Sequence, residues 1–126
     1  MLIPILNGIT ALMWSSSWGH LEIVKYLVEN AGDVNAINDD NATALIVASA
    51  YGRFRIVKYL FENGADINAL GGKDKMTALI LASSEGNLEL VKYLVEKGAD
   101  VNAKDKNNNS ALLLSSLFGH FEIVKL

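Results

Sequence analysis

Hydrophobic and polar positions along the chain repeat with a period of 33 or 34 residues. The phrase "VKYLVENAGDVNA" at 24–36 returns as "VKYLFENGADINA" at 57–69 and as "VKYLVEKGADVNA" at 91–103. Within each copy the apolar residues form one wide stripe at helical spacing, which favours an amphipathic helix. A unit of this size cannot bury its own apolar face, so the repetition predicts a stack of like units.

Each unit is predicted to hold two helices separated by a glycine. The first helix opens at a hydroxyl residue suited to an N-cap and ends about two turns later at a glycine, where a positive φ is commonly needed. The opening residues are Thr10, Thr43, Thr77 and Ser110, and the glycines are Gly19, Gly52, Gly86 and Gly119. The second helix is expected at 21–30, 54–63, 88–97 and 121–126, and polar turns separate the units.

The end of the second helix differs between units. Gly64 and Gly98 follow it in two units, and we expect both to act as C-caps. In the first unit the order is inverted, and Ala31 precedes Gly32. Because Ala in the left-handed region costs about 1–2 kcal/mol, we predict that Ala31 avoids it. Either the helix runs one residue longer and Gly32 takes the positive φ, or Asn30 takes it.

These units resemble ankyrin repeats. The 33-residue length, the "TAL" opening, the "GADVNA" run and the Gly-His pair after the first helix all match that family. The resemblance covers essentially the whole chain, as three full copies and one cut short. It implies an all-α solenoid of stacked helix-turn-helix pairs with short β-hairpin tips. We expect one domain over 1–126, with repeats at about 1–36, 37–69, 70–103 and 104–126.

Two signature residues of that family, a proline and a histidine, are absent. Alanine replaces the proline at Ala11, Ala44, Ala78 and Ala111. Apolar side chains replace the histidine at Met13, Ile46, Ile80 and Leu113. We expect the fold to survive on apolar packing, because Ala is an excellent helix former.

Composition narrows the classes of function. Charged residues make up 20% of the 126 residues and the formal net charge is −3, so the concentrated basic face of a nucleic-acid-binding protein is not expected. The absence of cysteine excludes disulfides and thiolate metal sites. No apolar run approaches the roughly 20 residues of a membrane span, and "MLIPIL" lacks the basic start of a signal peptide. We therefore expect an intracellular, cytoplasmic protein without membrane or nucleic-acid partners.

No set of residues indicates catalysis or a cofactor. His20 and His120 lie three repeats apart, so they cannot share a metal, and we expect loop histidines bonded to nearby backbone. The serines at 15–17 have no nearby base, and small residues there allow close helix packing. The "GGKDKM" stretch lacks the spacing of a phosphate loop. We predict no enzyme activity, no catalytic residue, no metal and no cofactor.

One set of residues, the pre-glycine row, departs from a core pattern. It stands just before each inter-helix glycine and consists of Trp18, Tyr51, Glu85 and Phe118. In ankyrin repeats this end of the first helix borders the concave groove, so we expect the three aromatics to be partly exposed and to bind a protein. An ordinary scatter of half-buried aromatics is the alternative. Trp14 stands where other units have Val47, Leu81 and Leu114, and we expect it in the core.

The resemblance implies a non-catalytic module that binds a protein partner through the groove and the hairpin tips. Residue by residue it adds tip candidates to the pre-glycine row. These are Ile37, Asp39 and Asp40 on the first tip, Lys73 and Lys75 on the second, and Lys104, Lys106 and Asn107 on the third. Fold alone does not name the partner.

A structural role is the alternative function. The chain would then be a segment of a longer array, or a natural or engineered scaffold that self-associates end to end. We expect an apolar patch at the C-terminal end, made of Leu112, Leu114, Phe121, Ile123 and Val124. If Ile123 faces outward, a charged residue there is expected to reduce association.

Overall fold

The computed structural model describes residues 8–31, 33–117 and 119–125. These residues form eight helices and no sheet. The helices are α1 (Gly8–Trp18), α2 (Leu21–Ala31), α3 (Ala44–Ala50), α4 (Phe54–Glu62), α5 (Ala78–Ser84), α6 (Leu88–Glu96), α7 (Ala111–Leu117) and α8 (Phe121–Val124). Two isolated antiparallel bridges, Gly71–Met76 and Lys104–Ser110, close the loops before α5 and α7.

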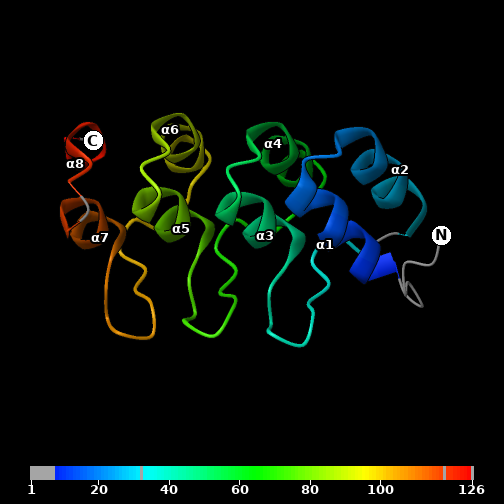
Figure 1. Ribbon diagram of the computed structural model, residues 1–126, viewed down its shortest axis with the longest axis horizontal. Helices are drawn as coiled ribbons and strands as arrows, with labels where there is room; N and C mark the ends of the chain where they lie inside the picture. Colours follow the sequence, from blue (N-terminus) through cyan, green and yellow to red (C-terminus); the bar gives the residue numbers. More distant parts are fainter. Residues whose placement is uncertain (1–7, 32, 118, 126) are drawn as a thin grey trace.

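The helices form two layers (Figure 1). The inner helices α1, α3, α5 and α7 lie side by side, and the outer helices α2, α4, α6 and α8 form the second layer. Three loops extend away from the outer layer, and we call them tip loops 1 (37–42), 2 (70–76) and 3 (104–109). All first helices therefore lie on one side of the stack, as the repeat pattern predicts.

Hydroxyl side chains cap three of the inner helices as predicted. Thr43 Oγ1 accepts a hydrogen bond from the Ile46 N–H at 3.3 Å, and Thr77 Oγ1 accepts one from the Ile80 N–H at 3.2 Å. Ser110 Oγ accepts from a backbone N–H in the first turn of α7 at 3.2 Å. Each cap satisfies one donor that the helix itself leaves unpaired.

The predicted cap at Thr10 is wrong, because α1 begins at Gly8 and Thr10 lies inside it. In the other repeats the residue two places before the cap has a positive φ, namely 61° at Asn41, 52° at Lys75 and 67° at Asn108. A residue with a positive φ is not part of a right-handed helix, so the helix cannot extend back into the tip loop and begins after the cap residue. The equivalent residue Gly8 is helical, which moves the start of α1 forward.

Glycines end the helices where the sequence predicts. The four inter-helix glycines have φ between 68° and 81°, and Gly64 and Gly98 have φ of 98°. The helix α2 runs through Asn30 and Ala31, which confirms that Ala31 avoids the left-handed region. Gly32 lies outside the described residues.

The core lies between the two layers and between successive inner helices. Leu45, Leu60, Leu79, Leu90 and Leu94 are almost fully buried there. The apolar residues in place of the signature histidine, Met13, Ile46 and Ile80, are also buried, so the expectation of apolar packing is confirmed at these positions. The small residues Ser16, Ser49 and Ser83 are buried at one repeat position of the inner helices.

Candidate functional site

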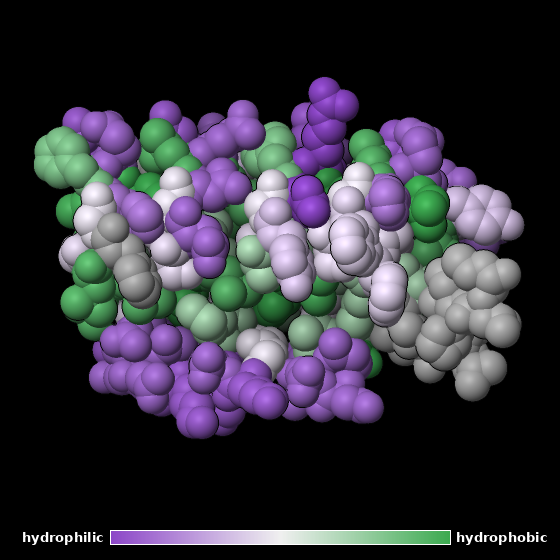
Figure 2. All heavy atoms as spheres, in the orientation of Figure 1, coloured by the Kyte–Doolittle hydropathy of each residue, from purple (hydrophilic) through white to green (hydrophobic). Residues whose placement is uncertain are grey.

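An apolar groove lies between the inner helices and the tip loops. Its central hollow has a volume of about 290 Å³. Val47, Ala50 and Tyr51 at the end of α3 line it on the helix side, and Asp40 and Lys73 line it on the loop side. Figure 2 shows the same arrangement, an apolar band above the hydrophilic tip loops. An apolar floor with a polar rim is the usual build of a protein-binding surface.

Tip loops 1 and 2 bring all five of their predicted site residues together. They line an open hollow of about 590 Å³, which contains Ile37, Asp39, Asp40, Lys73 and Lys75. The backbone N–H of Gly72 donates to the Asp40 carbonyl at 3.0 Å and holds the two loops side by side. Acidic and basic side chains therefore face one another across this hollow.

Tip loop 3 presents the remaining predicted residues, Lys104, Lys106 and Asn107, all of which are exposed. The Lys106 N–H donates to the Asp74 carbonyl at 2.7 Å, which links this loop to tip loop 2. The Asp105 carboxylate accepts hydrogen bonds from the Asn107 and Asn109 N–H groups at 2.9 and 2.8 Å. Because Asp105 is used within the loop, the two lysines set the charge that this tip shows to a partner.

The pre-glycine row is exposed as predicted at the positions that the structure describes. Trp18 is 61% exposed and Tyr51 is 63% exposed, far above the tenth that a core aromatic would show. Glu85 is exposed as well. Phe118 lies outside the described residues.

The expectation that Trp14 lies in the core is wrong. Its side chain is 55% exposed and stacks on Trp18 with ring centroids 6.5 Å apart. The equivalent residues Val47 and Leu81 are only half-buried and line the groove, so this position faces the groove. Residues four apart share a helix face, and the spacing of Trp14 and Trp18 was the signal that could have revealed the pair.

The residue after the inter-helix glycine ties one repeat to the next. His120 Nε2 lies 3.0 Å from the Ser84 carbonyl oxygen, 36 residues earlier. Arg53 Nε donates to the Ser17 carbonyl at 3.0 Å across the same separation. The expected backbone bond of a loop histidine is therefore confirmed at His120.

The described ranges, 8–31, 33–117 and 119–125, offer neither a metal-binding cluster nor a membrane-spanning helix. No group of three or more His, Cys, Asp or Glu side chains in them could hold a metal ion. Every helix in them is too short or too polar to cross a bilayer.

Comparison with known families agrees with the geometry. A family model described as "Ankyrin repeats (3 copies)" matches residues 2–70, and a second, "Ankyrin repeats (many copies)", matches residues 81–126. A search of the curated proteins found no match. The two family matches cover most of the chain, and the two-layered stack with its capped inner helices and tip loops is the structure they describe. The chain belongs to the ankyrin-repeat family.

Proposed function

We propose that the chain is a non-catalytic module that binds one protein partner in the groove. Ankyrin repeats are generally protein–protein interaction modules. The observation that carries the proposal for this chain is the exposure of Tyr51, which lines the groove, and of Trp18 and Trp14, which occupy the repeat positions of the groove residues Tyr51 and Val47. Exposed Trp and Tyr side chains are the residues that most often dominate the binding energy of an interface.

The tip loops supply the polar rim of the proposed interface. Asp39 and Asp40 make tip loop 1 acidic, whereas Lys73 and Lys75 on tip loop 2 are basic, as are the lysines of tip loop 3. This uneven charge favours one orientation of the partner, with its basic part over tip loop 1 and its acidic part over the other two. Rim charges of this kind act mainly on the association rate and on specificity.

The test compares capture of partners by three forms of the chain. The groove variant Trp14→Ala/Trp18→Ala/Tyr51→Ala should lose a partner that the wild type retains. The matched control is Tyr26→Ala, because Tyr26 is an exposed aromatic on the outer helix α2. A partner held equally by the wild type and the groove variant would contradict the proposal, provided that both show the same helical circular dichroism.

A second candidate function, end-to-end association, is favoured by an apolar face at the last described repeat. Leu112 is 59% exposed, whereas Leu79 at the same repeat position is 2% exposed. Likewise Leu113 is 43% exposed, whereas Ile80 is 1% exposed. Leu79 and Ile80 are covered by the repeat that follows them. Leu112 and Leu113 therefore offer a second copy the same apolar surface that Leu79 and Ile80 bury.

The composition of this face differs from the prediction. Leu112 and Phe121 are exposed as expected, but Leu114 and Ile123 are buried and Val124 is half-buried. Leu114 and Ile123 belong to the buried core of the stack and are not part of the exposed face. A charge at Ile123 would therefore damage the core and is the wrong remedy.

Sedimentation over a concentration series tests self-association. Leu112→Glu/Leu113→Glu should stay monomeric where the wild type forms larger species, because charge on the face opposes its burial. Ile37→Glu is the control, since Ile37 is an exposed apolar residue on tip loop 1, away from this face. A wild type that stays monomeric at millimolar concentration would overturn this second function.

A further inference from the structure

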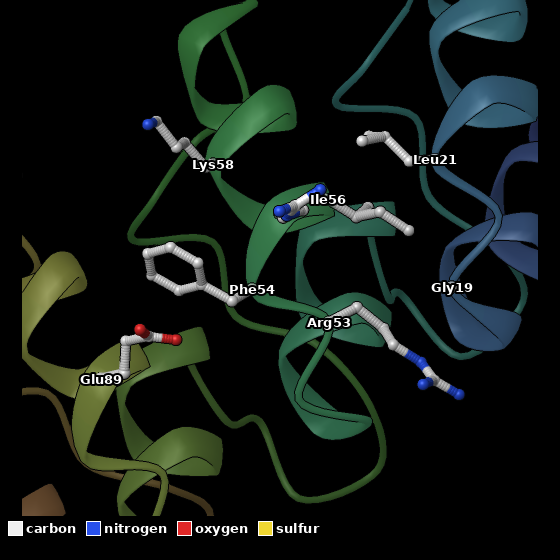
Figure 3. Close-up of a pocket in the computed structure, with 8 residues that line it drawn as sticks. Gly19, Leu21, Arg53, Phe54, Ile56, Lys58 and Glu89 are labelled. Carbon is white, nitrogen blue, oxygen red and sulfur yellow. The ribbon is translucent and has the colours of Figure 1, made fainter.

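A second surface, separate from the groove, combines a hollow with an excess of positive charge. Its volume is about 660 Å³, and it lies where the α1–α2 turn meets the first turns of α4 and α6 (Figure 3). Arg53, Arg55 and Lys58 line it with a single carboxylate, that of Glu89. Three cations against one anion form a local basic surface on a chain whose net charge is −3.

The charge on α4 departs from the pattern of the other repeats in a way that stacking does not require. The positions of Arg55 and Lys58 hold Glu22 and Lys25 on α2, where the two side chains pair at 3.9 Å. They hold Glu122 and Lys125 in the last repeat, where the pair is 3.4 Å apart. On α4 the favourable pair is replaced by two like charges at i and i+3, which disfavours the helix.

No ion pair within the described part of the chain offsets this repulsion. Neither Arg55 nor Lys58 takes part in an ion pair there, and both side chains are exposed. Glu89 shares the hollow but lies beyond ion-pair distance of both cations. An anionic group from outside the chain would relieve the repulsion.

Arg53 also lines the hollow, and the preceding repeat holds its side chain in place. Its Nε donates to the Ser17 carbonyl, and its side chain lies against Gly19, where a Cβ would come within 3.3 Å of the guanidinium carbon. The position of the Arg53 guanidinium is therefore set before any ligand binds, and its terminal nitrogens stay available as hydrogen-bond donors. A planar guanidinium fixed in this way suits a carboxylate, which it can bind through two parallel hydrogen bonds.

The apolar lining indicates more than a free anion. Leu21 and Phe54 are half-buried at the edge of the hollow, and Figure 3 shows them on opposite sides of Ile56. An apolar side chain of a ligand could contact either residue while neighbouring carboxylates reach the cations. We propose that this hollow binds an acidic protein segment in which carboxylates flank an apolar side chain, at a site independent of the groove.

The test is an NMR titration of the full chain with two blocked peptides, Glu-Glu-Leu-Glu-Glu and its uncharged match Gln-Gln-Leu-Gln-Gln. The acidic peptide should perturb the amides of Gly19, Arg55 and Lys58 and the Arg53 Nε–H signal. The Gln peptide should perturb them little. Added salt should weaken the acidic complex, since screening acts on exposed charges.

Charge variants separate this site from general electrostatic attraction. Arg55→Glu gives α4 the glutamate that the other repeats have at this position. It should weaken binding of the acidic peptide about tenfold. Lys92→Glu is the control, because it makes the same change in net charge. Lys92 occupies the repeat position of Lys58 on the next repeat and does not line the hollow. This variant should leave the affinity for the acidic peptide within about twofold of the wild type. Lys58→Glu serves as the second variant if Arg55→Glu does not fold.

Four results of the peptide titrations would overturn the proposal. They are equal binding of the two peptides, unchanged affinity in both α4 variants, an equal loss in Lys92→Glu, and perturbations confined to the groove. The last experiment is a titration with inorganic phosphate. Phosphate that binds as tightly as the acidic peptide would show a simple anion site and would also overturn binding of a protein segment.

Discussion

Asn68 and Asp100 are joined by a hydrogen bond between neighbouring repeats: the side-chain oxygen of Asn68 accepts from the Asp100 N–H at 2.7 Å. The same bond joins Asn35 to Asp66 at 2.6 Å, one repeat earlier. Asparagine recurs at this position because its side chain reaches the backbone of the next repeat. The stack is therefore held by repeated polar bonds as well as by its apolar core.

Asn68→Ala should destabilise the chain by about 1 kcal/mol, the usual net value of one hydrogen bond. Urea unfolding followed by circular dichroism measures the change. Asn102 is the matched control, because it stands at the same repeat position and its side chain makes no such bond among the described residues. Equal losses in Asn68→Ala and Asn102→Ala would show that the bond between repeats contributes nothing.

Gly86→Ala should be more damaging than Gly119→Ala. Both glycines have nearly the same φ, 74° and 73°, so both substitutions cost about 1–2 kcal/mol for the left-handed backbone. Only at Gly86 would the new Cβ meet a side chain, with His120 Cε1 at 2.6 Å. The difference in unfolding free energy reports this contact.

The control for this comparison is the His120→Ala background. There the extra cost of Gly86→Ala should disappear, because the clashing ring is gone. An extra cost that persists in this background would assign the difference to fraying of the last repeat.

Ser83→Ala should raise the unfolding free energy by about 1 kcal/mol, since a buried hydroxyl without a partner carries a desolvation cost. Ser83 Oγ is buried and has no hydrogen-bond partner among the described residues. Ser115 Oγ is buried too but donates to the Ala111 carbonyl at 2.8 Å, so Ser115→Ala should gain less. A clear loss of stability in Ser83→Ala would contradict the prediction.

Tyr93→Phe should keep or raise stability at neutral pH and change its dependence on alkaline pH. The Tyr93 hydroxyl is buried and has no hydrogen-bond partner in the described part of the chain, and the ring packs edge-on against Phe54 and Phe61. Burial, with a smaller contribution from the Glu62 carboxylate, raises the pKa of Tyr93 above its ordinary value of 10.0. The folded chain thus holds this proton more tightly than the unfolded chain does.

The sign of the pH effect follows from linkage. The contribution of Tyr93 is fully present below the unfolded pKa of 10.0 and is lost as the pH rises through the folded pKa. Above pH 10 the wild type should therefore lose stability more steeply than Tyr93→Phe. Denaturant unfolding across this pH range measures the unfolding free energy of both chains. If the unfolding free energies of the wild type and Tyr93→Phe fall in parallel with pH, the prediction is contradicted. Tyr26→Phe, at an exposed tyrosine, should change neutral-pH stability by less than about 0.5 kcal/mol.

Intrinsic fluorescence should report on the groove alone, because the chain has two tryptophans, Trp14 and Trp18, and both are exposed. The emission of the folded chain should lie close to that of the unfolded chain and be readily quenched by acrylamide. Trp14→Phe isolates Trp18 and serves as the control. A blue-shifted, protected signal that disappears in Trp14→Phe would return Trp14 to the core.

Local signals in the sequence determined the helices and most of their ends. The caps at Thr43 and Thr77 and the positive φ at Gly52 and Gly86 depend on residues within a few positions of each other. The repeat period determined the stack, because a two-helix unit must bury its apolar face on a like neighbour. The exposure of Trp18 and Tyr51 was expected from the resemblance to ankyrin repeats, in which this position borders the groove.

Tertiary structure alone decided which face of each unit has a neighbour. Trp14 shares a repeat position with Leu114, yet the tryptophan is exposed and the leucine is buried. The bond from Arg53 to Ser17 was equally hidden, since it depends on residues a whole repeat apart. A repeat pattern shows that a position is apolar, but burial is a property of the surrounding space, and that space exists only once the neighbouring repeats are in place.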